Sequence, residues 1–301
     1  MTTLCLEAIS LIRIKPVSRL SPEEGTALWN EGFQGYALDM TLTPDLYTAR
    51  FALEGLSPSL SLAAFEENEP AGFVMSGKRE QKGQLIAWNG GTGIVPRFRR
   101  RGIARVLMEA ALEQYRKEGV STAQVEAITQ NERALRLYRE LGYQETDRLI
   151  TLRWENPDAP PNFPSDTDYF CRPAPPREAA GLSFYRWEAP WQCQWSNPAG
   201  VEGWIVENEH RETVGYALYR TGTNSEGYLQ AVTLLQANVL PDHPDGEGVM
   251  KAALRPLFLP GSLSRSAFNL PTSNDFLLGL LKEAGFQPLV EQVAFAMDLE
   301  E

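Results

Sequence analysis

The sequence of 301 residues is poor in cysteine and histidine and has no long hydrophobic run. Its three cysteines are an odd number without metal-site spacing, which predicts free thiols in a reducing cytoplasm. Two histidines are too few for a typical histidine-rich site, so we expect no metal. No stretch approaches about 18 apolar residues, and the first ten residues have no basic region. These absences predict no membrane-spanning helix and no secretory signal.

Charge is unevenly distributed along the chain. Residues 1–155 hold 19 Lys and Arg against 20 Asp and Glu, whereas residues 156–301 hold 9 against 19. Nearly all of the net charge of −11 therefore belongs to the second half. An acidic surface repels phosphate, which argues against nucleic acid as a partner. It permits a cationic substrate, although an ordinary solvated acidic surface has the same composition.

The length and composition indicate two globular domains. A hydrophobic fraction of 43% excludes wholesale disorder, and about 150 residues is a usual domain size. The stretch at 155–168 contains four prolines among Asn, Asp and Ser, and cannot hold a helix or a central strand. We therefore expect one domain at residues 1–155, a Pro-rich linker at residues 156–167 and a second domain at residues 168–301.

The first domain mixes strands and helices, which predicts an α+β (mixed α/β) fold. The expected strands lie at 11–14, 60–65 and 72–75, and a further one starts at 85 after a polar turn at 77–83. A helical region begins near Ser21 and Pro22 and is broken at 55–58. Further on, the pattern predicts a helix at 102–118, a strand at 123–127, an Asn-capped helix at 131–142 and a strand at 148–154.

The second half resembles a diverged copy of the first. The segments 131–142 and 274–285 both begin with Asn and end with Gly, at an offset of 143. The segments 99–104 and 243–248 correspond at an offset of 144 and share a glycine. A nearly constant offset over both segments predicts a duplicated fold.

The segment 94–107, IVPRFRRRGIARVL, carries the chemistry. A strand ends near Pro96, three arginines follow, and Gly102 opens a helix whose first N–H groups lack intrahelical partners. Gly102 and Ala104 allow a ligand to approach the backbone, and arginine forks suit phosphate oxygens. The segment predicts a diphosphate site. Taken alone, the arginines also fit a solvated or nucleic-acid-binding patch.

In this context the first half resembles the GCN5-related N-acetyltransferase (GNAT) family. Arg99, Gly102 and Ala104 match its pyrophosphate motif, and residues 131–143 match its later motif N-x-x-A-x-x-L-Y-x-x-x-G-Y. The resemblance covers about residues 10–154. With the internal repeat, it implies two tandem GNAT-type domains, each a central, mostly antiparallel twisted sheet with helices on both faces.

The resemblance implies an acetyl-CoA-dependent N-acetyltransferase, an acyltransferase that moves an acetyl group to a primary amine by direct attack on the thioester. The amine belongs to a small molecule or a peptide, and residues 30–47 are expected to line its site. The residues implied in acetyl-CoA binding are Ile94, Val95, Arg99, Arg100, Arg101, Gly102, Ile103, Ala104, Arg105 and Asn131. For Asn131, an ordinary helix cap is the alternative interpretation.

Catalysis needs a base and an acid. An amine with a pKa near 10 must lose a proton before it attacks, and the leaving thiolate gains from a proton donor. The resemblance implies Glu126, or a water chain, as the base and Tyr138 as the acid. A structural carboxylate and a core aromatic are the alternative interpretations.

The second half departs from the motif. Pro244, Asp245 and Glu247 stand where the first half has residues 100, 101 and 103, and Leu281 stands where it has Tyr138. This predicts a degenerate GNAT-like domain that does not bind acetyl-CoA and that shapes the substrate site, forms a dimer or adds stability. The protein is expected to be a monomer or a homodimer. A non-catalytic acyl-CoA-binding or sensing protein of the same fold is the alternative function.

Overall fold

The computed structural model describes residues 12–156, 169–259 and 263–300. The first ten residues, Cys5 and all but residue 156 of the predicted linker lie outside the described residues. The chain forms two compact units. The first contains Met1–Glu126, Arg136–Gln144 and Phe295–Glu301, and the second contains Ala127–Leu135 and Glu145–Ala294. The domain boundaries expected near residues 155 and 168 stay predictions.

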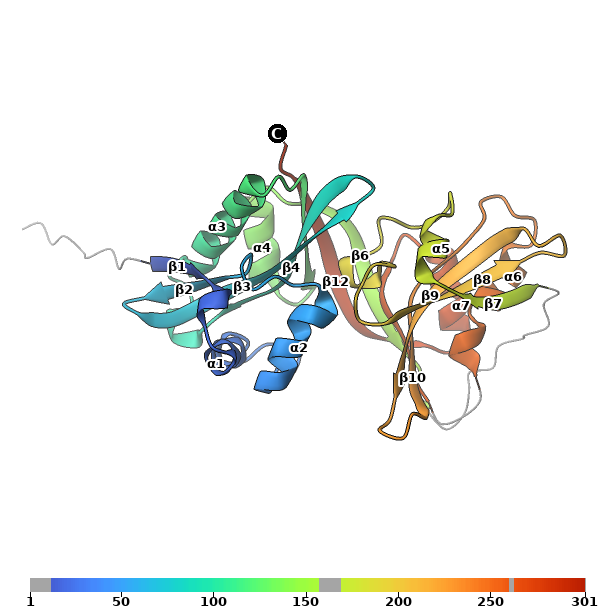
Figure 1. Ribbon diagram of the computed structural model, residues 1–301, viewed down its shortest axis with the longest axis horizontal. Coiled ribbons are helices and arrows are strands. Elements are labelled where there is room, and N and C mark those ends of the chain that lie inside the picture. The colour runs from blue at the N-terminus through green and yellow to red at the C-terminus, as the bar shows by residue number, and fades with distance from the viewer. Residues whose placement is uncertain (1–11, 157–168, 260–262, 301) are drawn as a thin grey trace, which may run out of the picture. The chain divides into compact units, whose positions relative to one another are not determined.

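The first unit is a mixed sheet with helices on both faces (Figure 1). Strands β1 (Ile12–Pro16), β2 (Leu62–Glu66), β3 (Glu69–Gln81) and β4 (Gln84–Ile94) are antiparallel neighbours, and β5 (Thr122–Ile128) runs parallel to β4. The end of β12 (Gln287–Asp298) follows in the strand order. Helices α1 (Pro22–Gly32) and α2 (Pro44–Glu54) lie on one face, and α3 (Ile103–Lys117) and α4 (Glu132–Glu140) lie on the other. The predicted α+β fold is confirmed.

Local sequence explains most of these elements. Ser21 and Glu24 form a reciprocal capping box at the start of α1, with Pro22 in the first turn. Helix α3 buries its apolar face, which includes Leu107, Met108 and Tyr115. The prediction of a helix over 102–118 is therefore confirmed.

The turn predicted at 77–83 is wrong, because β3 and β4 form a long hairpin. Strand β3 continues to Gln81, and only Lys82 and Gly83, with φ of 52° and 75°, make the turn. The added strand residues are mainly charged and partly exposed, so no hydrophobic alternation marks them as a strand.

The strands β4 and β5 part in the middle of the sheet. They pair from Ile86 opposite Thr122 to Asn89 opposite Val125. At that point β4 has a bulge at Gly90, between its pairs with Ser76 and Met75, and it continues to Ile94. The edge of β4 beyond Asn89 is thus not paired with β5.

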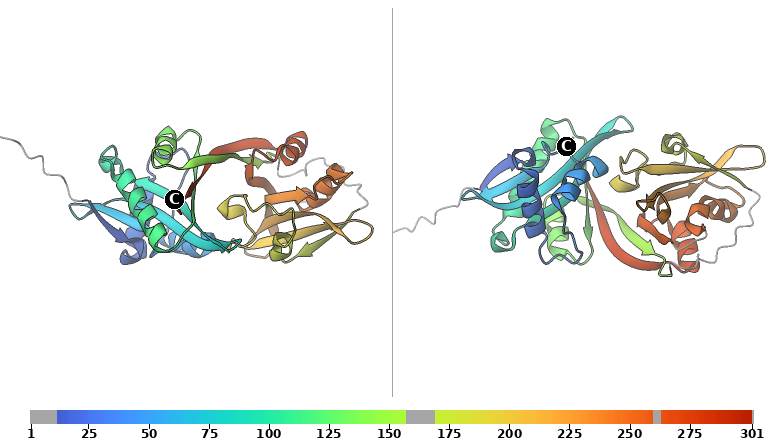
Figure 2. Two further views of the ribbon diagram at one scale, coloured as in Figure 1. Left: turned by 90° about the horizontal axis from the view of Figure 1, so that it is seen from above. Right: turned by 60° about the horizontal axis from the view of Figure 1, so that its bottom comes forward.

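The second unit repeats this plan. Strands β7 (Phe170–Ala174), β8 (Val201–Glu207), β9 (Thr213–Thr223) and β10 (Leu229–Val239) are antiparallel neighbours, and β11 (Ser264–Pro271) runs parallel to β10. Strand β6 (Gln144–Arg153) pairs with β11, and the start of β12 is next in order. Helix α5 (Pro176–Ala180) covers one face, and α6 (Gly246–Ala253) and α7 (Asp275–Glu283) cover the other (Figure 2).

The internal repeat also includes the bulge in the strand before the crossover helix. Pairing of β10 with β11 ends at Leu234 opposite Ala267, and β10 then bulges at Leu235. Helix α6 connects these two strands as α3 connects β4 and β5. The second unit therefore preserves the geometry of the first, while its side chains differ.

Candidate functional site

Helix α3 begins with its first backbone N–H groups open. Its N-cap residue, Gly102, has a φ of 80° and supplies no side-chain hydrogen bond. Arg100 also has a left-handed φ, of 66°. A Cβ atom at Gly102 would meet no other atom within 4 Å, so the space beside this backbone is open.

The other described helices longer than five residues are capped by side chains. The caps are Ser21 on α1, Thr43 on α2, Asn131 on α4, Asp245 on α6 and Asn274 on α7. Within the described ranges, α3 is the only helix longer than five residues that lacks such a cap. Uncapped N–H groups with the positive end of the helix dipole form a site for an anion.

The four predicted arginines differ in what they contact. Arg99 donates from Nε to the Ile94 carbonyl at 2.8 Å, and from Nη2 to the carbonyls of Gln34 at 2.6 Å and Gly32 at 3.2 Å. Arg99 thus joins the segment after α1 to the end of β4. Its predicted contact with a ligand stays a prediction.

The remaining arginines flank the helix start. Arg101 pairs with Glu66 at 2.7 Å, and Arg105 pairs with Glu140. Arg100 is exposed and makes no hydrogen bond or ion pair with any residue that the structure describes. Of the four, Arg100 has the cation most available to an incoming anion.

The other predicted binding residues lie in the same segment. The Val95 N–H donates to the Ala71 carbonyl at 3.0 Å, and the Val95 carbonyl accepts from Phe98 at 2.9 Å. Ile103 is buried beneath the helix start, and Ala104 is half-buried. The backbone of Val95 is therefore used within the sheet and the turn after it.

Asn131 acts as a helix cap. Its Oδ1 accepts from the Ala134 N–H at 3.3 Å, at the start of α4. The cap interpretation is thus confirmed, and a contact of Asn131 with the CoA arm stays a prediction.

Glu126 lies on the face of the sheet that carries α1 and α2. The Trp88 indole Nε1 donates to Glu126 Oε2 at 2.6 Å. Burial raises the pKa of Glu126 to about 7, against the opposing effects of the Trp88 hydrogen bond and of Arg79. Such a carboxyl exchanges its proton near neutral pH, as a general base must. Sequence reasoning missed Trp88, because its contact with Glu126 depends on the register of β4 against β5, which no local pattern indicates.

Tyr138 lies on the opposite face, with α3 and α4. It is 5% exposed, and its hydroxyl bonds the side chain of Thr92, which accepts from Asn89 Nδ2 at 2.8 Å. Its ring contacts those of Tyr143 and Phe295, each at 5.8 Å between centroids. Burial raises the pKa of Tyr138 above its usual value, so the phenol stays protonated and able to donate.

These side chains converge where β4 and β5 part. The Asn89 side chain donates to Met108 Sδ of α3, so Asn89 points to the face of α3 and α4. Because side chains alternate along a strand, the neighbouring Trp88 points to the opposite face, where it bonds Glu126. The candidate base and acid thus approach the end of the β4–β5 pairing from the two faces of the sheet. The arrangement suits a ligand that enters the parted strands with an anionic group at α3.

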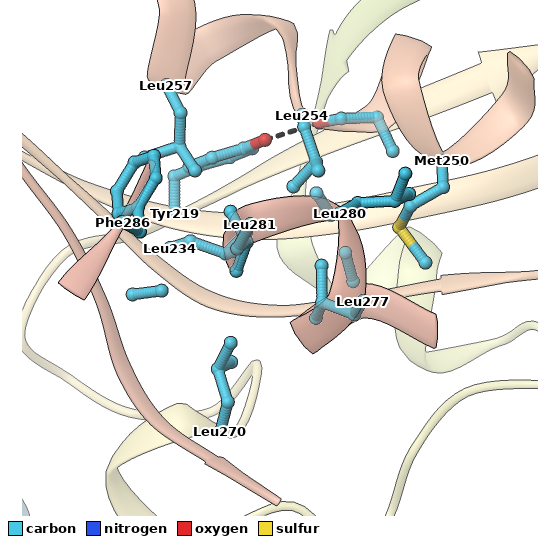
Figure 3. Close-up of a cluster of buried hydrophobic side chains, with 14 of the residues drawn as sticks. Tyr219, Leu234, Met250, Leu254, Leu257, Leu270, Leu277, Leu280, Leu281 and Phe286 are labelled. Carbon is cyan, nitrogen blue, oxygen red and sulfur yellow. Dashed lines mark hydrogen bonds between the residues drawn. The ribbon is translucent and has the colours of Figure 1, made fainter. Parts of the chain in front are cut away.

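The corresponding place in the second unit is filled. The Asp245 side chain accepts from the Gly248 N–H at 3.0 Å, and a Cβ at Gly248 would lie 2.2 Å from Asp245 Oδ2. Leu281, at the position of Tyr138, is fully buried in a cluster with Leu277 and Phe286 (Figure 3). The start of α6 is thus capped, and a leucine takes the place of Tyr138.

None of the described helices is long and apolar enough to cross a membrane. The described residues also contain no group of three or more His, Cys, Asp or Glu side chains that could hold a metal ion.

Residues 26–143 match the sequence model of the acetyltransferase (GNAT) family. This part of the chain is a GNAT domain. No curated protein matches the chain.

Solved structures of GNAT proteins, one of them a tandem GNAT protein, share the fold of the whole chain. A tandem GNAT protein from the clavulanic acid biosynthesis pathway is 15% identical with a TM-score of 0.62, over 96% of this chain and 99% of that one. A GCN5-related N-acetyltransferase from Sphaerobacter thermophilus is also 15% identical with a TM-score of 0.62, over 96% and 95%. A fungal glucosamine N-acetyltransferase region is 13% identical with a TM-score of 0.69, over 96% of this chain and 38% of that one. At these identities the likeness establishes the tandem GNAT fold.

Proposed function

We propose that the chain is an acetyl-CoA-dependent N-acetyltransferase with one working site, in the first unit. The uncapped start of α3 carries the proposal. Its N–H groups, the open space beside Gly102 and the exposed cation of Arg100 fit a diphosphate. The GNAT domain at residues 26–143 contains this segment together with Glu126 and Tyr138.

The residues of this site meet the needs of acetyl transfer to an amine. Acetyl-CoA supplies an acetyl group activated as a thioester. Glu126, with a pKa of about 7, takes the proton of the ammonium group, directly or through water. Tyr138 keeps its proton at neutral pH and donates it to the departing sulfur.

The second unit has the same fold without these groups, and we propose that it does not bind acetyl-CoA. Asp245 occupies the start of α6, and a carboxylate there repels a diphosphate. The acceptor is a primary amine of a small molecule or peptide, and we place the protein in the cytoplasm, as a monomer or homodimer. The chain's net charge of −11 argues against nucleic acid as a partner.

The test is to incubate the protein with acetyl-CoA and a panel of amines at several pH values and to measure free thiol. We expect amine-dependent thiol release that rises with pH through about 7, because Glu126 accepts a proton only as the carboxylate. Tight acetyl-CoA binding without release by any amine would instead indicate an acyl-CoA-binding or sensing protein. Absence of binding would contradict the proposal.

A further inference from the structure

The Trp88 indole donates a hydrogen bond to the Glu126 side chain. It lies on β4, 3% exposed, opposite Gln124 of β5. Because side chains alternate along a strand, Gln124 and Glu126 share a face, and Trp88 reaches diagonally to Glu126. This bond of 2.6 Å joins β4 to β5 close to the point where their pairing ends.

The position of the indole depends on the bulge in β4. A Cβ atom at Gly90 would lie 2.7 Å from Cζ3 of Trp88 and 2.9 Å from Leu56. The six-membered part of the ring therefore occupies the space that a side chain at residue 90 would take, beside the point where β4 leaves β5. Gly90 thus allows Trp88 to turn its N–H toward Glu126.

The chemistry of the indole suits a positioning role. An indole N–H donates a hydrogen bond but cannot accept a proton at ordinary pH. It holds Oε2 of Glu126 and leaves Oε1 to take the proton of the acceptor. Because the donated bond favours the carboxylate over the acid, it opposes the effect of burial on this group.

We propose that Trp88 is the positioning residue of Glu126, orienting its carboxylate and keeping it ionised near neutral pH. This role rests on the proposed acetyl transfer. The other groups acting on Glu126 are Arg79 of β3, which also favours the carboxylate, and Glu54 of α2, which disfavours it. Tyr138 interacts with Glu126 electrostatically from α4.

One test uses the native protein and needs no activity. In ¹⁵N-labelled protein, the Trp88 indole signal is assigned by its loss in Trp88→Phe and followed from pH 5 to 9. We expect it to shift with a midpoint near 7, the pKa of Glu126, and to stop shifting in Glu126→Gln. An indole signal indifferent to pH, or one that titrates equally in Glu126→Gln, would overturn the proposal.

The second test compares kcat of Trp88→Phe with that of the native chain across pH. Loss of the bond raises the pKa of Glu126 further above its native value of about 7, because the indole N–H no longer stabilises the carboxylate. The kcat of Trp88→Phe should therefore be about fivefold lower than that of the native chain at pH 7, and nearly equal to it near pH 9. A ratio independent of pH would mean that Trp88 acts through packing alone, against the proposal.

Trp204→Phe is the matched control. Its indole donates to the Ala252 carbonyl at 3.3 Å within the second unit, so the variant loses one comparable bond away from Glu126. We expect an unchanged kcat profile. If no amine is acetylated, the proposed function fails, whereas the indole titration still decides whether Trp88 and Glu126 are coupled.

Discussion

The starts of α3 and α6 occupy the same place in two copies of one fold, yet they offer a ligand opposite surroundings. In the first unit Gly102 leaves the N–H groups of α3 uncapped, and Arg100 stands exposed nearby. In the second unit Asp245 caps α6 and accepts a further hydrogen bond from the Tyr169 hydroxyl at 3.0 Å. The start of α3 leaves room for the anionic group of a ligand, whereas the start of α6 is already occupied by the Asp245 carboxylate.

Under the proposed function, the comparison shows how a binding site can be lost while its fold remains. The two parallel strand pairs, their crossover helices and the bulges at Gly90 and Leu235 all match. The difference lies in the side chains placed on this backbone. A carboxylate as N-cap typically stabilises a helix by about 1 kcal/mol, so closing the site also favours folding of the second unit.

Tyr138→Phe should have the largest effect. It keeps the ring against Tyr143 and Phe295 but removes the proton donor, as Leu281 does in the second unit. We expect kcat to fall roughly 100-fold with nearly unchanged acetyl-CoA affinity. Steady-state kinetics measures kcat, and calorimetry measures the acetyl-CoA affinity.

Tyr143→Phe is the control for this variant. The Tyr143 hydroxyl is buried without a hydrogen-bond partner among the described residues, so its removal deletes a similar group from the neighbouring ring. It should leave kcat unchanged. Equal losses in both variants would show that Tyr138 contributes packing rather than a proton.

Gly102→Asp copies the cap of α6 onto α3. At about 4 Å and an effective dielectric of about 20, a carboxylate and one phosphate charge repel by about 4 kcal/mol before screening. We expect acetyl-CoA affinity to fall more than tenfold, about 1.4 kcal/mol, by calorimetry. Gly102→Asn has the same shape and the same strain at a φ of 80°, but no charge. If the Asn variant binds as poorly, backbone strain and not charge explains the loss.

Arg100→Ala should weaken binding less. Arg100 has no protein partner among the described residues, so its charge is free to meet the diphosphate. We expect about fivefold weaker binding, about 1 kcal/mol, with a smaller difference in high salt. Arg97→Ala is the matched control, because Arg97 already pairs with Glu31 and Glu69. Equal effects would show that general charge, and not position, attracts the ligand.

Glu126→Gln should change stability in a way that depends on pH. Because the folded pKa, about 7, is raised above the unfolded value of about 4.3, the unfolded state loses its proton first as pH rises. Stability of the native chain therefore falls between these values and then levels off. The Gln variant avoids that fall, so above pH 7 it should be more stable by on the order of 1–2 kcal/mol.

Urea unfolding at pH 4.5 and pH 8.5 measures this difference. Near pH 4.5 the two proteins should be about equally stable, since Glu126 is then protonated in the folded state. A Gln variant less stable than the native chain at pH 8.5 would indicate a structural carboxylate, the alternative interpretation of Glu126.

Much of the fold was predictable because its signals are local. The helical spacing at 102–118 and the Asn-capped segment at 131–142 predict α3 and α4. The polar half of the β3–β4 hairpin was not, since its exposed charged residues carry no hydrophobic alternation. The placement of Phe295 beside Tyr138 was not predictable either, because it depends on pairing of the last strand with residues far away in sequence.

The helix start that forms the candidate site was predictable in position, whereas the contacts around it were only partly predictable. The order strand, arginines, glycine, helix locates the start of α3 from sequence alone. It does not show that Arg99 bonds three backbone carbonyls while Arg100 remains exposed. Nor does it show Trp88 beside Glu126, because that contact depends on the register of β4 against β5.

The number of acetyl-CoA molecules bound per chain tests the contrast between the two units most directly. We predict that calorimetric titration of the whole chain gives one site, and that Gly102→Asp weakens that site. Two sites per chain, or one site that Gly102→Asp leaves unchanged, would contradict the account, because the ligand would then bind where Asp245 caps α6 or at a place away from both helix starts.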